Sequence, residues 1–183
     1  MSPSVVLAVV MLGTAVVVSL PGWWLRPGRW HRWSGLAVLL LAGVSALLLA
    51  LRGLPTAESD GGRLLVVLLT GALALLGGGP LTTAVFGLVD GDRSSPRESV
   101  RQAAAVLRGG AWIGALERIA IYSSMAVGWP EGLAITLAIK GLGRYPELRH
   151  QDRPGIAERF LIGTFVSVLW AAACAGLAIL LLP

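Results

Sequence analysis

Charged residues interrupt long apolar stretches in the second half of this chain. Six ionisable residues are concerned: Glu117, Arg118, Lys140, Arg144, Glu158 and Arg159. An unpaired ion at the centre of a membrane helix costs about 2.5–3.5 kcal/mol on insertion scales. We therefore expect these groups to form a polar network between helices. The four positive groups outnumber the two carboxylates, which favours a phosphate, a carboxylate or another anion over a metal cation as the ligand.

Helical spacing divides the charges of the stretch 110–127 between two faces. Gly114, Arg118 and Tyr122 are four residues apart and share one face. The glycine lets a neighbouring helix approach, so we expect Arg118 to reach a carboxylate on that helix. Glu117 projects about 100° away and can serve a second partner.

The remaining charges follow in the next two apolar stretches. Lys140, Arg144 and Glu147 share a stripe, and Glu158 is expected to meet Lys140 or Arg144. The predicted ligand-binding or charge network is thus Glu117, Arg118, Tyr122, Lys140, Arg144, Glu147, Glu158 and Arg159. The alternative is that these charges only fix helix packing, although buried pairs stabilise a fold weakly.

The composition indicates which elements must hold these residues. The chain has 183 residues, of which 55% are hydrophobic and 14% charged, against about 25% charged in soluble domains. We predict an all-α polytopic membrane helix bundle that forms a single integral membrane domain over 1–183. The six predicted spans are 4–20, 34–51, 64–89, 110–128, 130–145 and 156–182. The fifth is either a short protein-shielded span or a re-entrant element.

Basic residues predict the orientation of these spans. They concentrate in the loops after the first, third and fifth spans: Arg26, Arg29, Arg32, Arg93, Arg97, Arg101, Arg108, Arg149 and Arg153. By the positive-inside rule these loops face the cytoplasm of a bacterial cell, so both termini lie outside the inner membrane. This distribution explains the net charge of +5 without nucleic acid as a partner.

A short cytoplasmic amphipathic helix is predicted between the third and fourth spans. Ser95 is a suitable N-cap and Pro96 a suitable first helical residue. Arginines on its polar face are expected to meet anionic lipid headgroups of the bilayer. Residues 1–90 would then hold the first three spans, and residues 94–183 this helix and the last three.

The third span contains a strong helix-breaking signal. Three glycines and a proline follow one another there: Gly77, Gly78, Gly79 and Pro80. Proline lacks a backbone donor and clashes with the preceding turn, so we predict a helix break at these residues, and we prefer a simple packing kink to a break that builds a site. Transporters use broken helices to build ion and substrate sites.

Three segments carry a resemblance to a known family. They are 113–118 (IGALER), 138–148 (AIKGLGRYPEL) and 157–164 (AERFLIGT). The region 109–170 resembles domain of unknown function 3307, an uncharacterised family of small prokaryotic membrane proteins. Members tend to have a longer polar linker after the arginine than this chain has. The resemblance implies that the charged positions belong to a shared module, and it assigns no activity.

Enzyme and metal motifs are sparse in this sequence. It has no His-x-x-x-His motif and one cysteine, so we assign no catalytic residue, metal ligand or cofactor. Three functions remain open. The first is a permease or channel-like protein for a small anionic solute or ion, packed as a homo-oligomer through small-residue faces. The second is an integral-membrane accessory or anionic-lipid-binding module. The third is a membrane enzyme acting on a lipid-linked anion, with Glu117 or Glu158 as acid or base.

Overall fold

Every element that the computed structural model describes is helical. The described residues are 3–20, 37–38, 40–44, 60–89, 110–149 and 156–182. They form α1 (Pro3–Ser19), α4 (Asp60–Val89), α6 (Gly110–Ala126), α7 (Pro130–Arg149) and α8 (Ile156–Leu181). Further helical residues lie at 37–38 and 40–44. The all-α prediction is confirmed, whereas the amphipathic helix and the basic loops used to predict orientation lie almost wholly outside the described residues.

Two of these helices are long and apolar enough to cross a membrane. They comprise the 30 residues Asp60–Val89 and the 25 residues Ala157–Leu181. At 1.5 Å per residue, both exceed a hydrocarbon core of about 30 Å. A shorter apolar helix, Val9–Ser19, lies within α1.

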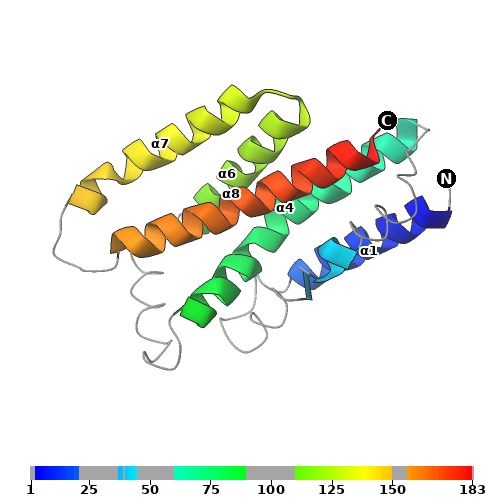
Figure 1. The fold of residues 1–183 in the computed structure, drawn as a ribbon, viewed down its shortest axis with the longest axis horizontal. Coiled ribbons are helices and arrows are strands. Elements are labelled where there is room, and N and C mark those ends of the chain that lie inside the picture. Colours follow the sequence, from blue (N-terminus) through cyan, green and yellow to red (C-terminus); the bar gives the residue numbers. More distant parts are fainter. Residues whose placement is uncertain are drawn as a thin grey trace.

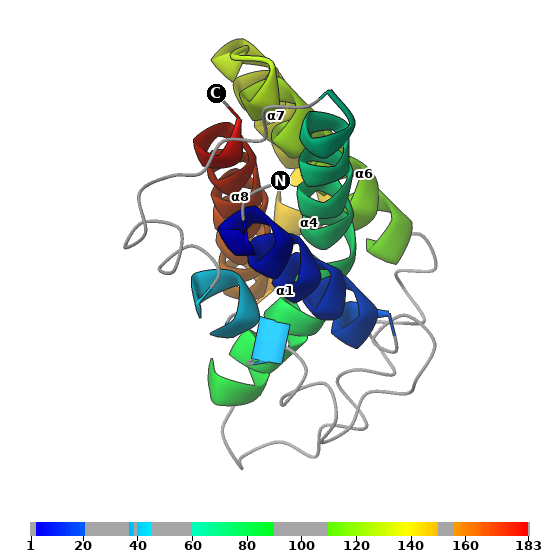
Figure 2. The same cartoon turned by 90° about the vertical axis from the view of Figure 1, so that its right-hand side faces the viewer.

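Helices α4, α6 and α8 form the centre of the bundle. Along α4 and α6, Thr70 meets Tyr122 while Leu75 meets Arg118, so these two helices are antiparallel. Figures 1 and 2 show α8 packed along α4, α1 also packed against α4, and α7 running back beside α6. Helix α7 therefore lies at the edge of the bundle, and it contacts chiefly α6.

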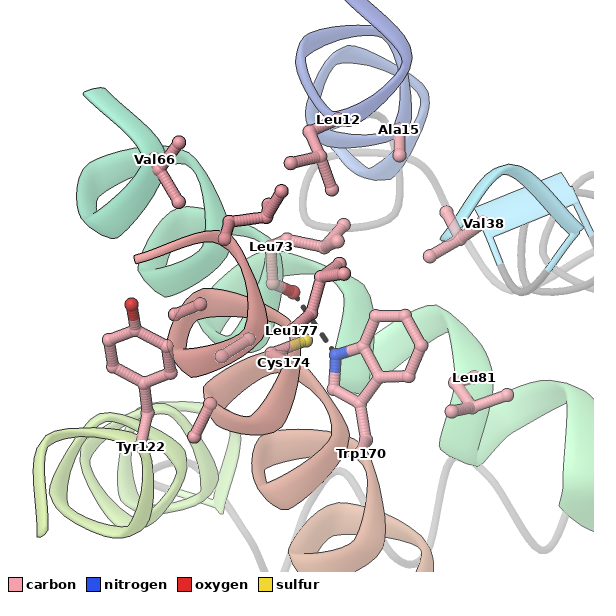
Figure 3. Close-up of a cluster of buried hydrophobic side chains, with 14 residues drawn as sticks. Leu12, Ala15, Val38, Val66, Leu73, Leu81, Tyr122, Trp170, Cys174 and Leu177 are labelled. Carbon is pink, nitrogen blue, oxygen red and sulfur yellow. Dashed lines mark hydrogen bonds between the residues drawn. The ribbon is translucent and has the colours of Figure 1, made fainter. Parts of the chain in front are cut away.

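The hydrophobic core joins α1, α4, α6 and α8 (Figure 3). Leu12 of α1 faces Leu73 of α4 and Leu177 of α8, and all three side chains are buried. Trp170 contributes the largest aromatic side chain, and its indole Nε1 donates a hydrogen bond to the Leu73 carbonyl over 3.1 Å. The polar edge of this ring is thus satisfied by the backbone of α4.

Helices α6 and α7 form a tight antiparallel hairpin. Gly128 has a φ of +72°, a left-handed conformation that glycine adopts without steric cost. The Gly128 N–H donates to the Met125 carbonyl, and the Trp129 N–H donates to the Ser124 carbonyl over 2.8 Å. This is a Schellman motif, and Pro130 then begins α7 at the position where proline is favoured. Helix α7 is continuous over its 20 residues, so it includes the whole of the predicted segment 130–145.

The predicted helix break at Gly77, Gly78, Gly79 and Pro80 is wrong, because α4 continues through these residues. Pro80 removes one N–H donor from the helix. Two threonines that follow it add hydrogen bonds from their hydroxyls to carbonyls one turn earlier. The Thr82 hydroxyl donates to the Gly78 carbonyl over 2.7 Å, and the Thr83 hydroxyl donates to the Gly79 carbonyl over 3.1 Å.

Two of the glycines serve close packing instead of flexibility. A Cβ at Gly77 would lie 2.8 Å from the Trp170 ring, and one at Gly78 would lie 2.7 Å from Arg118 Nε. A Cβ at Gly79 would meet nothing within 4 Å. The run of glycines is thus the surface on which side chains from α6 and α8 rest.

This packing predicts opposite outcomes for neighbouring substitutions. Gly78→Ala should destabilise the protein by about 1–3 kcal/mol, because the pinned Arg118 side chain cannot move aside freely. Gly79→Ala, the matched control, should be neutral or stabilising by up to about 1 kcal/mol, since alanine is the better helix former. Unfolding of both variants in detergent micelles, followed by circular dichroism, measures the difference. Equal destabilisation by the two changes would contradict this packing.

Candidate functional site

An ion pair links the two arms of the α6–α7 hairpin. Lys140 Nζ of α7 contacts the Glu117 carboxylate of α6. Glu117 is 11 residues before Gly128 and Lys140 is 12 residues after it, so the pair lies about 17 Å along the helices from the turn. If the turn lies at a membrane surface, this is near the middle of a hydrocarbon core of about 30 Å.

The ion pair also reaches the central bundle. The Lys140 ammonium lies 5.8 Å from the centroid of the Phe160 ring of α8, which is within the range of a cation–π interaction. Glu117 and Lys140 retain 12% and 18% of their side-chain exposure. The pair is therefore largely enclosed at the junction of α6, α7 and α8.

Arg118 occupies the adjacent face of α6, where 6% of the residue is exposed. Its Nε and Nη2 atoms donate to the Leu75 carbonyl of α4 over 3.2 and 3.0 Å. Its Nη1 atom lies 3.5 Å from the Ser167 hydroxyl of α8, at the limit of a hydrogen bond. The prediction that Arg118 meets a carboxylate is wrong, because close approach at Gly78 brings a backbone carbonyl to the guanidinium.

Tyr122 continues the contact between α6 and α4. Its hydroxyl donates to the Val67 carbonyl over 2.9 Å and shares a 2.7 Å hydrogen bond with the Thr70 hydroxyl. The expected common face of Arg118 and Tyr122 is confirmed, since both contact α4. Their hydrogen bonds hold α6 to the backbone of α4 at two levels.

The other predicted residues lie around the ends of α7 and α8. Arg159 lies 5.9 Å from the centroid of the Phe86 ring of α4. Glu158 is exposed, and among the described side chains it pairs with neither Lys140 nor Arg144. That expectation is wrong because Glu117 holds Lys140 instead. Arg144 is half-buried, and the side chain of Glu147 lies outside the described residues.

An open groove runs from the turn toward the ion pair. It has a volume of about 330 Å³, and its walls include Ala120 of α6 and Thr136 of α7. Ala120 is one helical turn from Glu117, and Thr136 is one turn from Lys140. The Ser124 hydroxyl, also in the wall, donates to its own helix backbone over 2.7 Å.

The sequence interpretation missed three parts of this arrangement: the groove, the Ser167 contact and the acceptor role of Leu75. Small residues at helical spacing on both arms of the hairpin signal the groove, and the pair Thr164 and Ser167 signals a polar face on α8. Nothing in the sequence marks the Leu75 carbonyl. Within the described helices, no three His, Cys, Asp or Glu side chains are grouped to hold a metal ion.

Comparisons with protein-family models, with curated proteins and with solved structures gave no match. The chemistry of the site is therefore argued from its geometry alone.

The ion pair predicts a specific pattern of stability. Glu117→Gln or Lys140→Met alone should destabilise the protein by about 3–5 kcal/mol, because each leaves one enclosed charge without its partner. The exchange Glu117→Lys with Lys140→Glu should recover most of this loss. Glu131→Gln, at the exposed start of α7, is the matched control and should change stability by about 0.5 kcal/mol. A double-mutant cycle followed by thermal unfolding measures the coupling, and additive single effects would contradict the pair.

Proposed function

We propose that this chain is a permease or channel-like membrane protein for a small anionic solute or ion. The observation that carries this proposal is the Glu117–Lys140 ion pair half-way along an apolar helical hairpin, beside a buried arginine. Ionisable residues inside membrane segments are rare and mark ion pathways, substrate pathways and proton relays.

The surface of the hairpin supports a membrane location. Leu116, Ile139 and Leu142 are 65%, 65% and 74% exposed, although they flank the charged pair. A soluble protein would not leave so continuous an apolar surface in water, whereas lipid covers it without cost. The two long apolar helices support the same location.

The directions of the helices support a polytopic arrangement. Helices α4 and α7 run opposite to α6, and contacts along α8 show it running parallel to α6. Arg118 of α6 lies beside Ser167 of α8, and Tyr122 lies beside Cys174. Residue numbers therefore rise in the same direction along both helices. We propose that each of these helices crosses the inner membrane, as parts of six spans with both termini outside. We also propose that residues 109–170 form the module shared with domain of unknown function 3307.

Local charge supports an anion as the transported species. The enclosed groups are two cations, Arg118 and Lys140, and one carboxylate, Glu117. One positive charge, that of Arg118, therefore remains in excess inside the bundle, on the face of α6 that contacts α4 and α8. A homo-oligomer packed through the α6–α7 hairpin would shield the partly exposed ion pair from lipid, which supports the proposed oligomer.

Reconstituted protein should carry a measurable anion flux that depends on the pair. In liposomes loaded with an anion-sensitive dye, Glu117→Gln and Lys140→Met should reduce chloride or phosphate flux at least tenfold. Glu131→Gln should retain the wild-type flux, because this residue lies at the end of α7 away from the pair. Because both variants are expected to lose stability, circular dichroism of the liposomes must show that the reconstituted protein is folded before a loss of flux is scored. The absence of flux with every small anion tried in folded wild-type protein would exclude the proposal.

The runner-up function is an accessory module that binds anionic lipids. The observation that favours it is Arg159, which lies over Phe86 at the end of the bundle where basic residues accumulate in the sequence. Arginine side chains near a membrane surface attract anionic headgroups by about 1 kcal/mol each.

Native mass spectrometry of gently extracted protein tests this second function. If lipid binding is the principal role, anionic lipid should remain bound to the wild type and be largely lost from Arg159→Gln. Arg63→Gln, at the opposite end of α4, serves as the matched control. Equal lipid retention by the wild type and both variants would contradict a lipid-binding role for Arg159.

A further inference from the structure

The Arg118 guanidinium has more N–H donors than the described residues around it provide acceptors. Arginine carries five N–H donors, and three of them are directed to the Leu75 carbonyl and the Ser167 hydroxyl. In the described part of the bundle, the remaining N–H on Nη1 and on Nη2 has no hydrogen-bond acceptor. Both acceptors that are present are uncharged, and the neighbouring carboxylate, Glu117, is engaged with Lys140. A buried charge normally has a counter-ion, and Arg118 lacks a direct one.

Thr164 of α8 has the complementary anomaly. Its hydroxyl is buried and has no hydrogen-bond partner. The other threonines in the described helices each donate to a carbonyl of their own helix: Thr14, Thr70, Thr82, Thr83 and Thr136. Thr164 is the exception among them, and a free buried hydroxyl costs roughly 1–3 kcal/mol.

The two anomalies occur at the same place in the bundle. Thr164 and Ser167 are three residues apart and share a face of α8. Because α6 and α8 run parallel, with Arg118 beside Ser167, Thr164 lies at the level of Gly114, one turn before Arg118. A Cβ at Gly114 would meet one atom within 4 Å, Arg118 Nη1 at 3.3 Å. The absent side chain of Gly114 therefore leaves room beside Nη1.

We propose that a small inorganic anion of the size of chloride binds between Arg118 Nη1 and the hydroxyls of Thr164 and Ser167. The guanidinium supplies the charge and an N–H donor, the two hydroxyls supply O–H donors, and Gly114 supplies the space. A water molecule can satisfy the same hydrogen bonds, but it leaves the guanidinium without a counter-ion. The contact between Nη1 and the Ser167 oxygen is 3.5 Å long, and the hydroxyl that accepts it still has its own O–H to donate to the anion.

The anion site rests on the proposed function only for the class of the ligand, because it places an anion inside a bundle that we propose to conduct anions. Binding is measurable without transport, so the two proposals fail separately. Chloride that binds with no flux would contradict the function and leave the site. Flux of a larger solute with no chloride binding would contradict the site alone.

Thermal unfolding of the full chain in detergent tests the site with chloride as the probe. Sodium gluconate is replaced by sodium chloride at constant ionic strength, and the midpoint of unfolding is followed. A ligand that binds only the folded state raises this midpoint in a saturable way. We expect saturation in the wild type and at least tenfold weaker apparent binding in Thr164→Val, which keeps the shape but loses the donor.

Matched variants separate this site from general salt effects. Thr164→Ser keeps the hydroxyl and should therefore retain chloride binding. Thr14→Val, the same change at a threonine bonded within α1, should leave binding unchanged, and Ser167→Ala provides a second loss variant should Thr164→Val fail to fold. The proposal is overturned if chloride and gluconate give the same midpoint, or if the chloride effect is equal in the wild type, Thr164→Val and Ser167→Ala.

Discussion

The hydrogen bonds from Arg118 to the Leu75 carbonyl are the interaction on which the centre of the bundle depends. They require α6 to approach α4 closely, and Gly78 permits this approach because it has no side chain. The same guanidinium reaches Ser167, so one side chain contacts all three central helices. Glu117, the preceding residue, points toward α7 and holds the fourth helix. Two consecutive residues of α6 thus organise the positions of α4, α7 and α8.

Helical spacing in the sequence predicted the directions of these side chains, but it did not predict all of their partners. It placed Arg118 and Tyr122 on one face and Glu117 on another, as the structure confirms. It failed at Arg118 because a leucine carbonyl leaves no trace in a pattern of side chains. It failed at Glu158 because the nearer carboxylate, Glu117, engages Lys140. Partner choice depends on how far each helix is displaced along its neighbour, which periodicity within one helix does not contain.

The run of glycines and proline in α4 shows a similar limit of local reasoning. Each residue type weakens a helix when it is considered alone. In the folded chain, Trp170 and Arg118 pack where glycine side chains are absent, and the threonines after Pro80 add hydrogen bonds. The stability of the segment therefore comes from α6 and α8. Where local helix preference and tertiary packing disagree, the conformation of a segment can be assigned only when the helices that pack against it are known.

In the membrane arrangement that we propose, the Schellman turn at Gly128 would also affect how the chain enters a bilayer. Helices α6 and α7 contact each other through residues that are close in sequence, so the hairpin can form before α8 is synthesised. Glu117 and Lys140 neutralise each other within the hairpin, so in the proposed membrane arrangement neither charge would cross the hydrocarbon alone. Arg118 differs, because its acceptors lie on α4 and α8. The order of synthesis thus provides α4 as a docking surface first, the self-neutralised hairpin second, and α8 as the element that encloses the arginine last.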